Sequence, residues 1–299
     1  MNEIIIICGP TASSKTALAV EVAKKLNTDV VSADSLYVYK GLNIGTAKPT
    51  VKEMDGVNHH LIDVCEPTDT FSVGDYRELA LPIIKDLLSK GKTPIICGGT
   101  GFYINSILYD FSYGDGKGNL ELRDYYFNLA EERGNQFVFN ILKEKDYQTS
   151  LKLHQNDLKR VIRALEICEN GRKKSEIIDE QKPLFNYKAF CVDFPREVLY
   201  DRINRRVDIM FDNGLIEEVN NLLDLGVNRD SQCMQGIGYK EVFDYFDGKI
   251  DLYKLKETIK LNTRHYAKRQ ITYFKKLQGL IYLEPNNINE LSNRIIEQL

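Results

Sequence analysis

The stretch IIIICGPTASSKTALAVEVAKKL, residues 4–26, decides the fold of this chain of 299 residues. Its first five residues, Ile4–Cys8, form an apolar run with the pattern of a strand buried on both faces. A turn-rich loop follows over Gly9–Ser14, and Lys15–Leu26 has the apolar spacing of an amphipathic helix. A loop that leaves a buried strand and opens a helix is the setting in which a phosphate-binding loop is meaningful.

The predicted phosphate site consists of eight consecutive residues, Gly9, Pro10, Thr11, Ala12, Ser13, Ser14, Lys15 and Thr16. Backbone N–H groups and the helix dipole would attract an anion, Lys15 would add a mobile charge, and Thr16 would offer a hydroxyl ligand to Mg²⁺. The pattern expects glycine before the lysine. If this position needs a positive φ, Ser14 carries roughly 1–2 kcal/mol of strain. The alternative is an ordinary turn capped by Thr11 or Ser13.

Strand and helix patterns alternate beyond this point. Residues 29–32 and 93–97 have strand patterns and residues 73–88 a helical one, which predicts a parallel sheet flanked by crossover helices. Asp34 would then lie at the carboxyl end of the second strand, beside the first loop, where sites gather in open α/β sheets. A turn or helix-capping aspartate is the alternative. His59 and His60 have no metal-ligand partner nearby in sequence, and we expect them to be structural.

The middle of the chain changes character. Residues 112–119 are polar and rich in glycine, and the following residues up to about Pro183 have mainly helical patterns. Strand patterns return at Tyr187–Val192 and near Leu280–Leu283, in an otherwise helical C-terminal part. We therefore predict a catalytic core of the P-loop NTPase type over residues 1–111 and 187–299, with a helical insertion domain over residues 112–186.

The composition is that of an ordinary soluble globular protein, with 43% hydrophobic and 28% charged residues. No apolar run approaches the roughly 20 residues of a membrane span, and the start shows no cationic leader. Six cysteines without any C-x-x-C pair fit buried thiols in a reducing cytoplasm and no structural zinc. We expect a cytoplasmic monomer that does not bind membranes.

A cluster of positive charge stands out near the C-terminus. The net charge of −3 argues weakly against a nucleic-acid binder, yet residues 254–276 hold eight Lys or Arg and one acid. Within them Lys256, Lys260, Arg264 and Lys268 recur every four residues, which places them on one helix face. Phosphate-backbone contact is the favoured interpretation. An ordinary solvated face is the alternative.

Motifs along nearly the whole chain resemble the tRNA dimethylallyltransferases of the bacterial type. They follow the family order: Gly9–Ser13, Ala33–Ser35, Val38–Gly41, Ile44–Pro49, His59–Asp63, Gly98–Tyr103, Asn156–Asp157, Arg160, Arg163–Glu166, Arg202, Arg206, Met210, Gly214–Leu215, Gly236–Glu241 and Ala267–Thr272. The resemblance implies transfer of a dimethylallyl group from dimethylallyl diphosphate to N6 of an adenine next to the tRNA anticodon. It also implies Mg²⁺ and an insertion that grips the anticodon stem-loop.

The resemblance assigns roles to single residues. Asp34 resembles the general base that takes the N6 proton, a role typically worth about 10²–10⁴-fold in rate. Lys15, Thr100 and Arg206 are the other catalytic candidates, and Arg202 joins the phosphate loop in binding diphosphate. Arg202 and Arg206 are four residues apart on a predicted helix, so they share a face. The target base must be flipped out of its stack into a pocket. The implied tRNA-contacting residues are Asp34, Ser35, Leu36, Tyr37, Thr100, Arg123, Lys159, Arg160, Val161, Ile162, Arg163, Gly238, Tyr239, Lys240, Lys260, Arg264, Lys268, Arg269 and Gln270. Among the tyrosines, Tyr37 and Tyr239 are candidates for stacking on flanking bases.

Three other functions remain open on the sequence. A small-molecule kinase using ATP would explain the first loop and Asp34 but not the cationic helix. A prenyltransferase acting on free adenine nucleotides would not need the helical insertion. A non-catalytic RNA-binding protein stays possible because Ser14 replaces the expected glycine.

Overall fold

A computed structural model of the chain describes residues 3–109, 119–177 and 182–299. The chain divides into two compact units, a main unit of Met1–Leu108 with Pro183–Leu299 and an insertion unit of Tyr109–Lys182. The sequence placed the ends of the insertion at residues 112 and 186, within four residues of these bounds. The polar segment that suggested the first boundary lies, except for Asn119, outside the described residues.

One parallel sheet organises the main unit. The described strands pair in the order β3-β2-β4-β1-β5-β6. Their bounds are β1 Glu3–Cys8, β2 Val30–Ser32, β3 His59–His60, β4 Ile95–Gly98, β5 Asn186–Val192 and β6 Leu280–Leu283. The parallel α/β class predicted from the alternating pattern is therefore confirmed. Every predicted strand is present with shifts of a residue or two at its ends.

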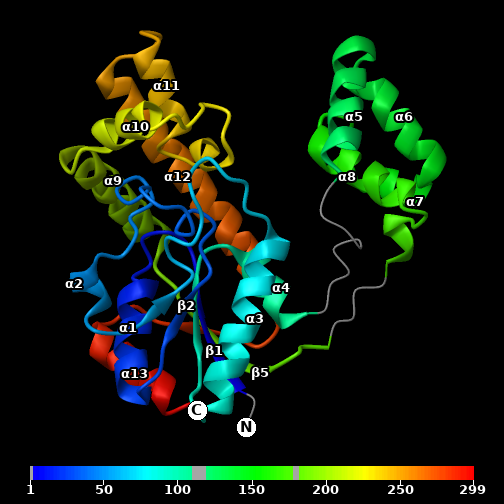
Figure 1. The fold of residues 1–299 in the computed structure, drawn as a ribbon. Coiled ribbons are helices and arrows are strands. Elements are labelled where there is room, and N and C mark those ends of the chain that lie inside the picture. The colour runs from blue at the N-terminus through cyan, green and yellow to red at the C-terminus, as the bar shows by residue number, and fades with distance from the viewer. Residues whose placement is uncertain (1–2, 110–118, 178–181) are drawn as a thin grey trace. The chain divides into compact units, whose positions relative to one another are not determined.

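The helices of the main unit carry the crossovers and the C-terminal part (Figure 1). Their bounds are α1 Lys15–Leu26, α2 Val51–Met54, α3 Val73–Ser89, α4 Gly101–Leu108, α9 Arg196–Asp212, α10 Leu215–Asp224, α11 Lys240–Phe246, α12 Leu252–Phe274 and α13 Ile288–Ile296, with a 3₁₀ turn at Gln232–Gln235. Within the described ranges, every helix is too short or too polar to span a membrane.

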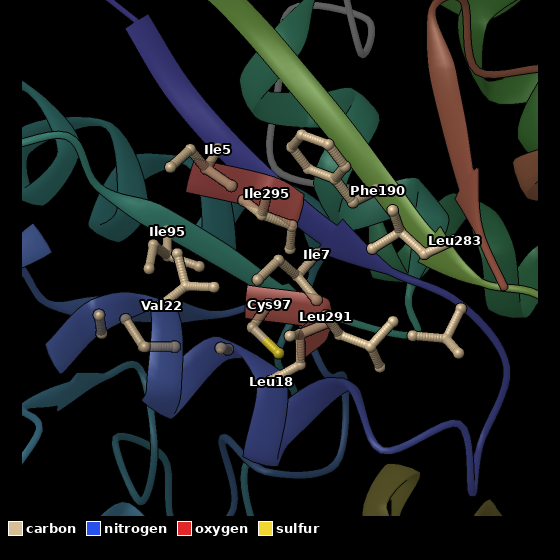
Figure 2. Close-up of a cluster of buried hydrophobic side chains, with 14 residues drawn as sticks. Ile5, Ile7, Leu18, Val22, Ile95, Cys97, Phe190, Leu283, Leu291 and Ile295 are labelled. Atoms are coloured by element: carbon tan, nitrogen blue, oxygen red, sulfur yellow. The ribbon is translucent and has the colours of Figure 1, made fainter. Parts of the chain in front are cut away.

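The apolar core lies between the sheet and the pair α1 and α13. Figure 2 shows Leu18 and Val22 of α1 beside Leu291 and Ile295 of α13, all facing the side chains of the central strands. The strand residues that meet them are Ile5, Ile7, Ile95, Cys97, Phe190 and Leu283. Because β1 is covered on both faces, its run of isoleucines is fully buried, as the unbroken apolar pattern indicated. This packing fixes the end of β1, where the phosphate loop begins.

The insertion unit has a core of its own. Its helices are α5 Leu120–Arg133, α6 Asn135–Lys145, α7 Tyr147–Ser150 and α8 Leu158–Glu169, with a 3₁₀ turn at Lys174–Glu176. Val138, Leu142, Val161 and Leu165 are completely buried among them. The insertion is therefore helical, as its sequence pattern predicted.

One strand was not predicted. His59–His60 forms β3 and pairs with Val30 and Val31 of β2, and His60 Nε2 lies 2.9 Å from a carboxylate oxygen of Asp29. Two residues are too few to show the alternating pattern from which strands are identified. The structural role expected for both histidines agrees with this pairing.

Candidate active site

The phosphate loop combines three unusual backbone conformations. Gly9, Ala12 and Ser14 have φ values of 141°, 63° and 61°. At Gly9 an added Cβ would lie 3.0 Å from Cys191 Sγ, so glycine fits both the backbone angle and the space. The positive φ that we considered at Ser14 is present, and it places this residue in the left-handed region just before α1. Ser14 therefore carries the strain that the sequence indicated.

Two arginines on one face of α9 hold this loop. Arg202 donates from Nε to the Ala12 carbonyl at 2.7 Å and from Nη2 to Ser14 Oγ at 2.5 Å. One turn later, Arg206 donates from Nη1 to Thr11 Oγ1 at 2.9 Å. The shared face predicted from the spacing of four residues brings both side chains to the loop.

Positive charge accumulates around the loop. Burial and the positive charge of Arg206 lower the pKa of the Lys15 ammonium group, and the same two causes lower the pKa of Arg202. Lys15 donates to the Pro10 carbonyl at 3.2 Å. Among the described residues, no ion pair with a carboxylate is found for Lys15, Arg202 or Arg206. Cations crowded together in this way favour a polyanionic ligand such as a diphosphate.

Asp34 lies at the carboxyl end of β2, as predicted. Its Oδ1 accepts the Leu36 N–H at 3.0 Å, which fixes the turn that follows the strand. β4 is the neighbour of β2 in the sheet, and Thr100 from the loop after β4 accepts the Ser35 N–H through Oγ1 at 3.0 Å. A Cβ on Gly98 would lie 2.1 Å from the Ala33 carbonyl oxygen, so only glycine allows these two loops to approach this closely.

The phosphate loop and the turn after β2 both line one cavity of about 380 Å³ in the main unit. Lys15 and Arg206 line it on the side of the phosphate loop, and Asp34 lines it from the end of β2. Apolar side chains complete the wall, namely Leu36, Val207, Met210, Ile237 and Ile259. A carboxylate, cationic side chains beside the phosphate loop and an apolar wall thus line the same cavity. This arrangement can hold a diphosphate ester with an apolar group and place a proton acceptor near it.

A buried carboxylate supports the wall of the cavity. Glu218 on α10 accepts the N–H groups of Asn43, Ile44 and Gly45 at 2.9, 2.7 and 3.0 Å. It also accepts the Tyr239 hydroxyl at 2.7 Å. These bonds fix the loop in which Gly45 and Thr46 line the cavity. Nothing in the sequence singled out Glu218, because a glutamate on a helix is usually a solvated surface residue.

Several predicted tRNA contacts occupy other positions than expected. Val161 and Ile162 are 0% and 2% exposed in the core of the insertion unit, so their side chains cannot meet RNA. Tyr239 is also completely buried, and its ring cannot stack on a base. Helical periodicity explains the first error, since an apolar pair between basic residues faces inward. The second arises because the sequence did not reveal the acid that binds the tyrosine hydroxyl.

The cationic stripe on α12 is not a continuous open face. Lys260 forms ion pairs with Asp208 at 2.8 Å and Glu257 at 3.2 Å, and its side chain is only 15% exposed. Arg264 donates to Asn204 at 2.6 Å. Lys256 lies 5.1 Å from the ring centroid of Phe211. These side chains pack on α9, which the spacing of residues on α12 alone could not show. Lys268 and Arg269 remain exposed.

The cations of the insertion unit divide into those that bind a buried carboxylate and those that are exposed to solvent. Arg123 and Arg163 both bind the buried carboxylate of Glu166, at 3.0 and 2.5 Å. Lys159 is exposed, and Arg160 is 71% exposed while it pairs with Asp157 at 3.2 Å.

Near the main cavity, Gly238 is buried whereas Lys240 is exposed and lines the cavity. The tRNA roles of the exposed cations stay predictions.

The predicted metal ligand Thr16 lines a hollow of about 10 Å³ beside the main cavity, together with Asp34 and Ser32. The available oxygen donors there are hydroxyl and carboxylate groups, the ligand types that Mg²⁺ prefers. Within the described residues, no group of three or more His, Cys, Asp or Glu side chains could hold a metal ion.

Comparisons with known proteins agree on one family. The family model described as IPP transferase matches residues 37–277. A tRNA dimethylallyltransferase of Acetivibrio thermocellus is 42% identical over 100% of this chain and 96% of its own length. Another, of Caldanaerobacter subterraneus, is 47% identical over 99% and 97%.

Solved structures give the same result. A tRNA isopentenylpyrophosphate transferase of Bacillus halodurans superposes with a TM-score of 0.74 at 39% identity, covering 100% of this chain and 97% of the other. A eukaryotic dimethylallyltransferase acting on tRNA gives a TM-score of 0.84 at 26% identity, with 100% and 77% covered.

Proposed function

The chain belongs to the IPP transferase family, and on this premise we propose that it transfers a dimethylallyl group to tRNA. The donor is dimethylallyl diphosphate, the acceptor is N6 of the adenosine next to the anticodon at position 37, and diphosphate is released. The observation that carries the proposal is the shared cavity. Asp34 lines the same space as Lys15 and Arg206, so an acceptor amine and a diphosphate leaving group can meet there.

The reaction needs a base and a stabilised leaving group. The N6 nitrogen attacks the first carbon of the dimethylallyl group, and the C–O bond to diphosphate breaks with its electron pair. The N6 proton passes to the carboxylate of Asp34. Negative charge that develops on the diphosphate oxygens meets the cationic side chains of Lys15 and Arg206, which line the cavity. N–H groups of the phosphate loop other than that of Thr11, which Gln270 binds, would add to this stabilisation.

We propose Mg²⁺ as the cofactor of this site. The hydroxyl of Thr16 lines a hollow beside the phosphate loop and offers an oxygen ligand. Mg²⁺ commonly binds through one or two protein groups and completes its shell with water and substrate phosphates. When bound, the ion would supply positive charge to the diphosphate.

Exposed cations would position the RNA. Lys268 and Arg269 lie on the exposed side of α12, and Lys240 stands at the cavity. Lys159 and Arg160 offer similar charges on the insertion unit. Phosphate contacts of this kind fix the register of a nucleic acid. The target adenine would leave its stack and enter the cavity beside Ser35, Leu36 and Tyr37.

The oligomeric state and compartment follow as part of the proposal. The residues that line the cavity all belong to the main unit, and we propose that the active form is a monomer. All six cysteines are free, and five of them are buried. Free thiols persist in the reducing cytoplasm, where we place the protein.

Product analysis by mass tests the function. The chain is incubated with Mg²⁺, dimethylallyl diphosphate and unmodified tRNA, and we expect the mass of one dimethylallyl group on an adenosine at position 37. Parallel reactions contain free adenine nucleotide in place of tRNA, or ATP in place of the donor. Prenylated free nucleotide, or ATP consumption without prenylated tRNA, would overturn the proposal in favour of the two alternative enzymes.

A further inference from the structure

Helix α12 approaches the loop after β4 unusually closely. A Cβ on Gly99 would lie 2.3 Å from Nε2 of Gln270, and one on Gly101 would lie 2.2 Å from a ring carbon of Tyr273. Any side chain at these two glycines would push the helix away. Side chains of α12 therefore reach the backbone on which Thr100 is carried.

Gln270 connects two loops with one side chain. Its Oε1 accepts the N–H of Thr11 in the phosphate loop at 2.9 Å, and its Nε2 donates to the Gly99 carbonyl at 2.9 Å. The residue is only 5% exposed. Both ends of the amide are used in a buried position, where an unmet partner is costly. The sequence assigned Gln270 to RNA contact, whereas these bonds direct its side chain to the interior.

Tyr266 lies one helical turn before Gln270 and on the same face of α12. It lines the main cavity, and the side chains of Thr100 and Gln270 lie near enough to its hydroxyl to act on the pKa of that group. Burial, and then the negative charge of Asp34, raise the pKa of this hydroxyl to about 12. The hydroxyl is therefore protonated at neutral pH and acts as a neutral hydrogen-bonding group.

Thr100 is the point where these contacts converge. Its Oγ1 accepts the N–H of Ser35, and its hydroxyl donates to Ser35 Oγ at 3.3 Å. The Thr100 hydroxyl is thus bonded to the turn that carries Asp34, and it lies near the Tyr266 hydroxyl. Gln270 joins the phosphate loop to the loop that carries Thr100, through Thr11 and Gly99. One turn of α12 therefore joins the side of the cavity that receives the amine to the side that receives diphosphate.

We propose that Tyr266 and Gln270 are positioning residues, Tyr266 orienting the Thr100 hydroxyl beside Asp34 and Gln270 holding the phosphate loop in register with it. This inference rests on the proposed function. It assigns a separate effect to each residue. Tyr266 acts on the chemical step through Thr100, whereas Gln270 acts on the binding of the diphosphate donor.

A double-mutant cycle tests the role of Tyr266. Tyr266→Phe, Thr100→Val and the double variant are compared by kcat on tRNA at saturating donor. Tyr266→Phe should lower kcat about tenfold, the loss that corresponds to one hydrogen bond. In the Thr100→Val background the same change should alter kcat by less than about twofold, because two residues that act as a unit are not additive. Tyr253→Phe, at an exposed position of the same helix, is the matched control.

The results of the double-mutant cycle distinguish a failure of the positioning role from a failure of the proposed function. Equal factors in both backgrounds would mean that Tyr266 does not act through Thr100, and an unchanged kcat would overturn its role. Prenylation by the unaltered chain is measured in the same series. If the unaltered chain modifies tRNA and the cycle is additive, only the positioning role fails. If the unaltered chain makes no product, the proposed function itself fails.

Gln270→Met tests the second half of the inference. Methionine keeps the approximate volume and removes both hydrogen bonds. The KM for dimethylallyl diphosphate should rise about tenfold, while the KM for tRNA stays within about twofold. Exposed Gln278→Met is the control. A purely structural role would raise both KM values together, and this result would overturn the inference.

Discussion

The carboxylate of Glu218 accepts the Tyr239 hydroxyl at 2.7 Å, and three backbone N–H groups of residues 43–45 bind the same carboxylate. Glu218→Gln would place an amide N–H₂ among groups that are all donors. We expect a loss of about 2–3 kcal/mol in the free energy of unfolding, since a buried unmet donor costs that much. Tyr239→Phe, which removes one bond, should cost about 1 kcal/mol. Urea denaturation measures both losses.

The residue before Glu218 provides the control for the Glu218 and Tyr239 variants. Glu217 lies on the exposed side of α10, and Glu217→Gln should leave the midpoint of unfolding unchanged. An equal loss in the two glutamine variants would mean that the four bonds of Glu218 contribute nothing specific to stability.

Asp34→Asn separates the proposed base from its structural role. Asparagine keeps an oxygen that can accept the Leu36 N–H at this turn, so the loop should hold its shape. The variant cannot take the N6 proton, and kcat should fall by about 10²–10⁴-fold with tRNA affinity unchanged. Asp230→Asn, at an exposed position, should behave like the unaltered chain. A kcat for Asp34→Asn near that of the unaltered chain would remove Asp34 as the base.

Ser14 combines a strained backbone with a useful hydrogen bond. Its φ is 61°, and its Oγ accepts from Arg202. Ser14→Ala loses the bond and keeps the strain, whereas Ser14→Gly loses the bond and relieves the strain. The glycine variant should therefore be more stable than the alanine variant by about 1 kcal/mol, and it should bind the donor more tightly than that variant. Equal stability and donor affinity would show that this position tolerates a side chain at no cost.

The central part of the fold was predictable because its signals are local. An unbroken apolar run such as Ile4–Cys8 indicates a strand covered on both faces, and the loop that follows it is recognised by position. β3 was not predicted, because its two half-buried residues are too few to show an alternating pattern of apolar and polar residues. Arg202 and Arg206 were placed on one helix face from spacing alone, and that face does meet the phosphate loop.

The remaining features of the site depend on which elements pack together. Lys260 has the same spacing as exposed Lys268, yet its side chain pairs with Asp208 of α9. Gln270 lies in a basic stretch of the kind that binds RNA, but its side chain is buried and bonds to the phosphate loop. Nothing within α12 distinguishes these faces, because the distinction comes from neighbours that are far away in sequence.

The acid stability of the sheet edge should depend on Asp29. Burial opposes ionisation of this carboxyl, but hydrogen bonds from Asn58, His60 and Lys92 outweigh it and lower the pKa to about 2. The pKa in the unfolded chain is about 3.9, so the folded state favours the charged form and gains stability above about pH 4. That contribution, about 2 kcal/mol, should be lost as the pH falls from about 4 to 2. Asp29→Asn should remove this pH dependence from the free energy of unfolding, and an unchanged profile would contradict the role of Asp29.

Lys268 and Lys260 lie on the same helix and differ in their surroundings, which makes them a matched pair for tRNA binding. Lys268 is exposed, so Lys268→Ala should remove one phosphate contact and reduce the slope of log affinity against log salt by about 0.7–0.9. Lys260 is engaged by Asp208 and Glu257, so Lys260→Ala should leave the slope unchanged and instead lower the stability of the packing between α9 and α12. Filter binding across a salt series measures the slopes, and thermal unfolding measures the stability. If Lys260→Ala flattens the slope as much as Lys268→Ala, the ion pairs of Lys260 open when RNA binds, and the continuous cationic stripe expected from the sequence would form in the complex.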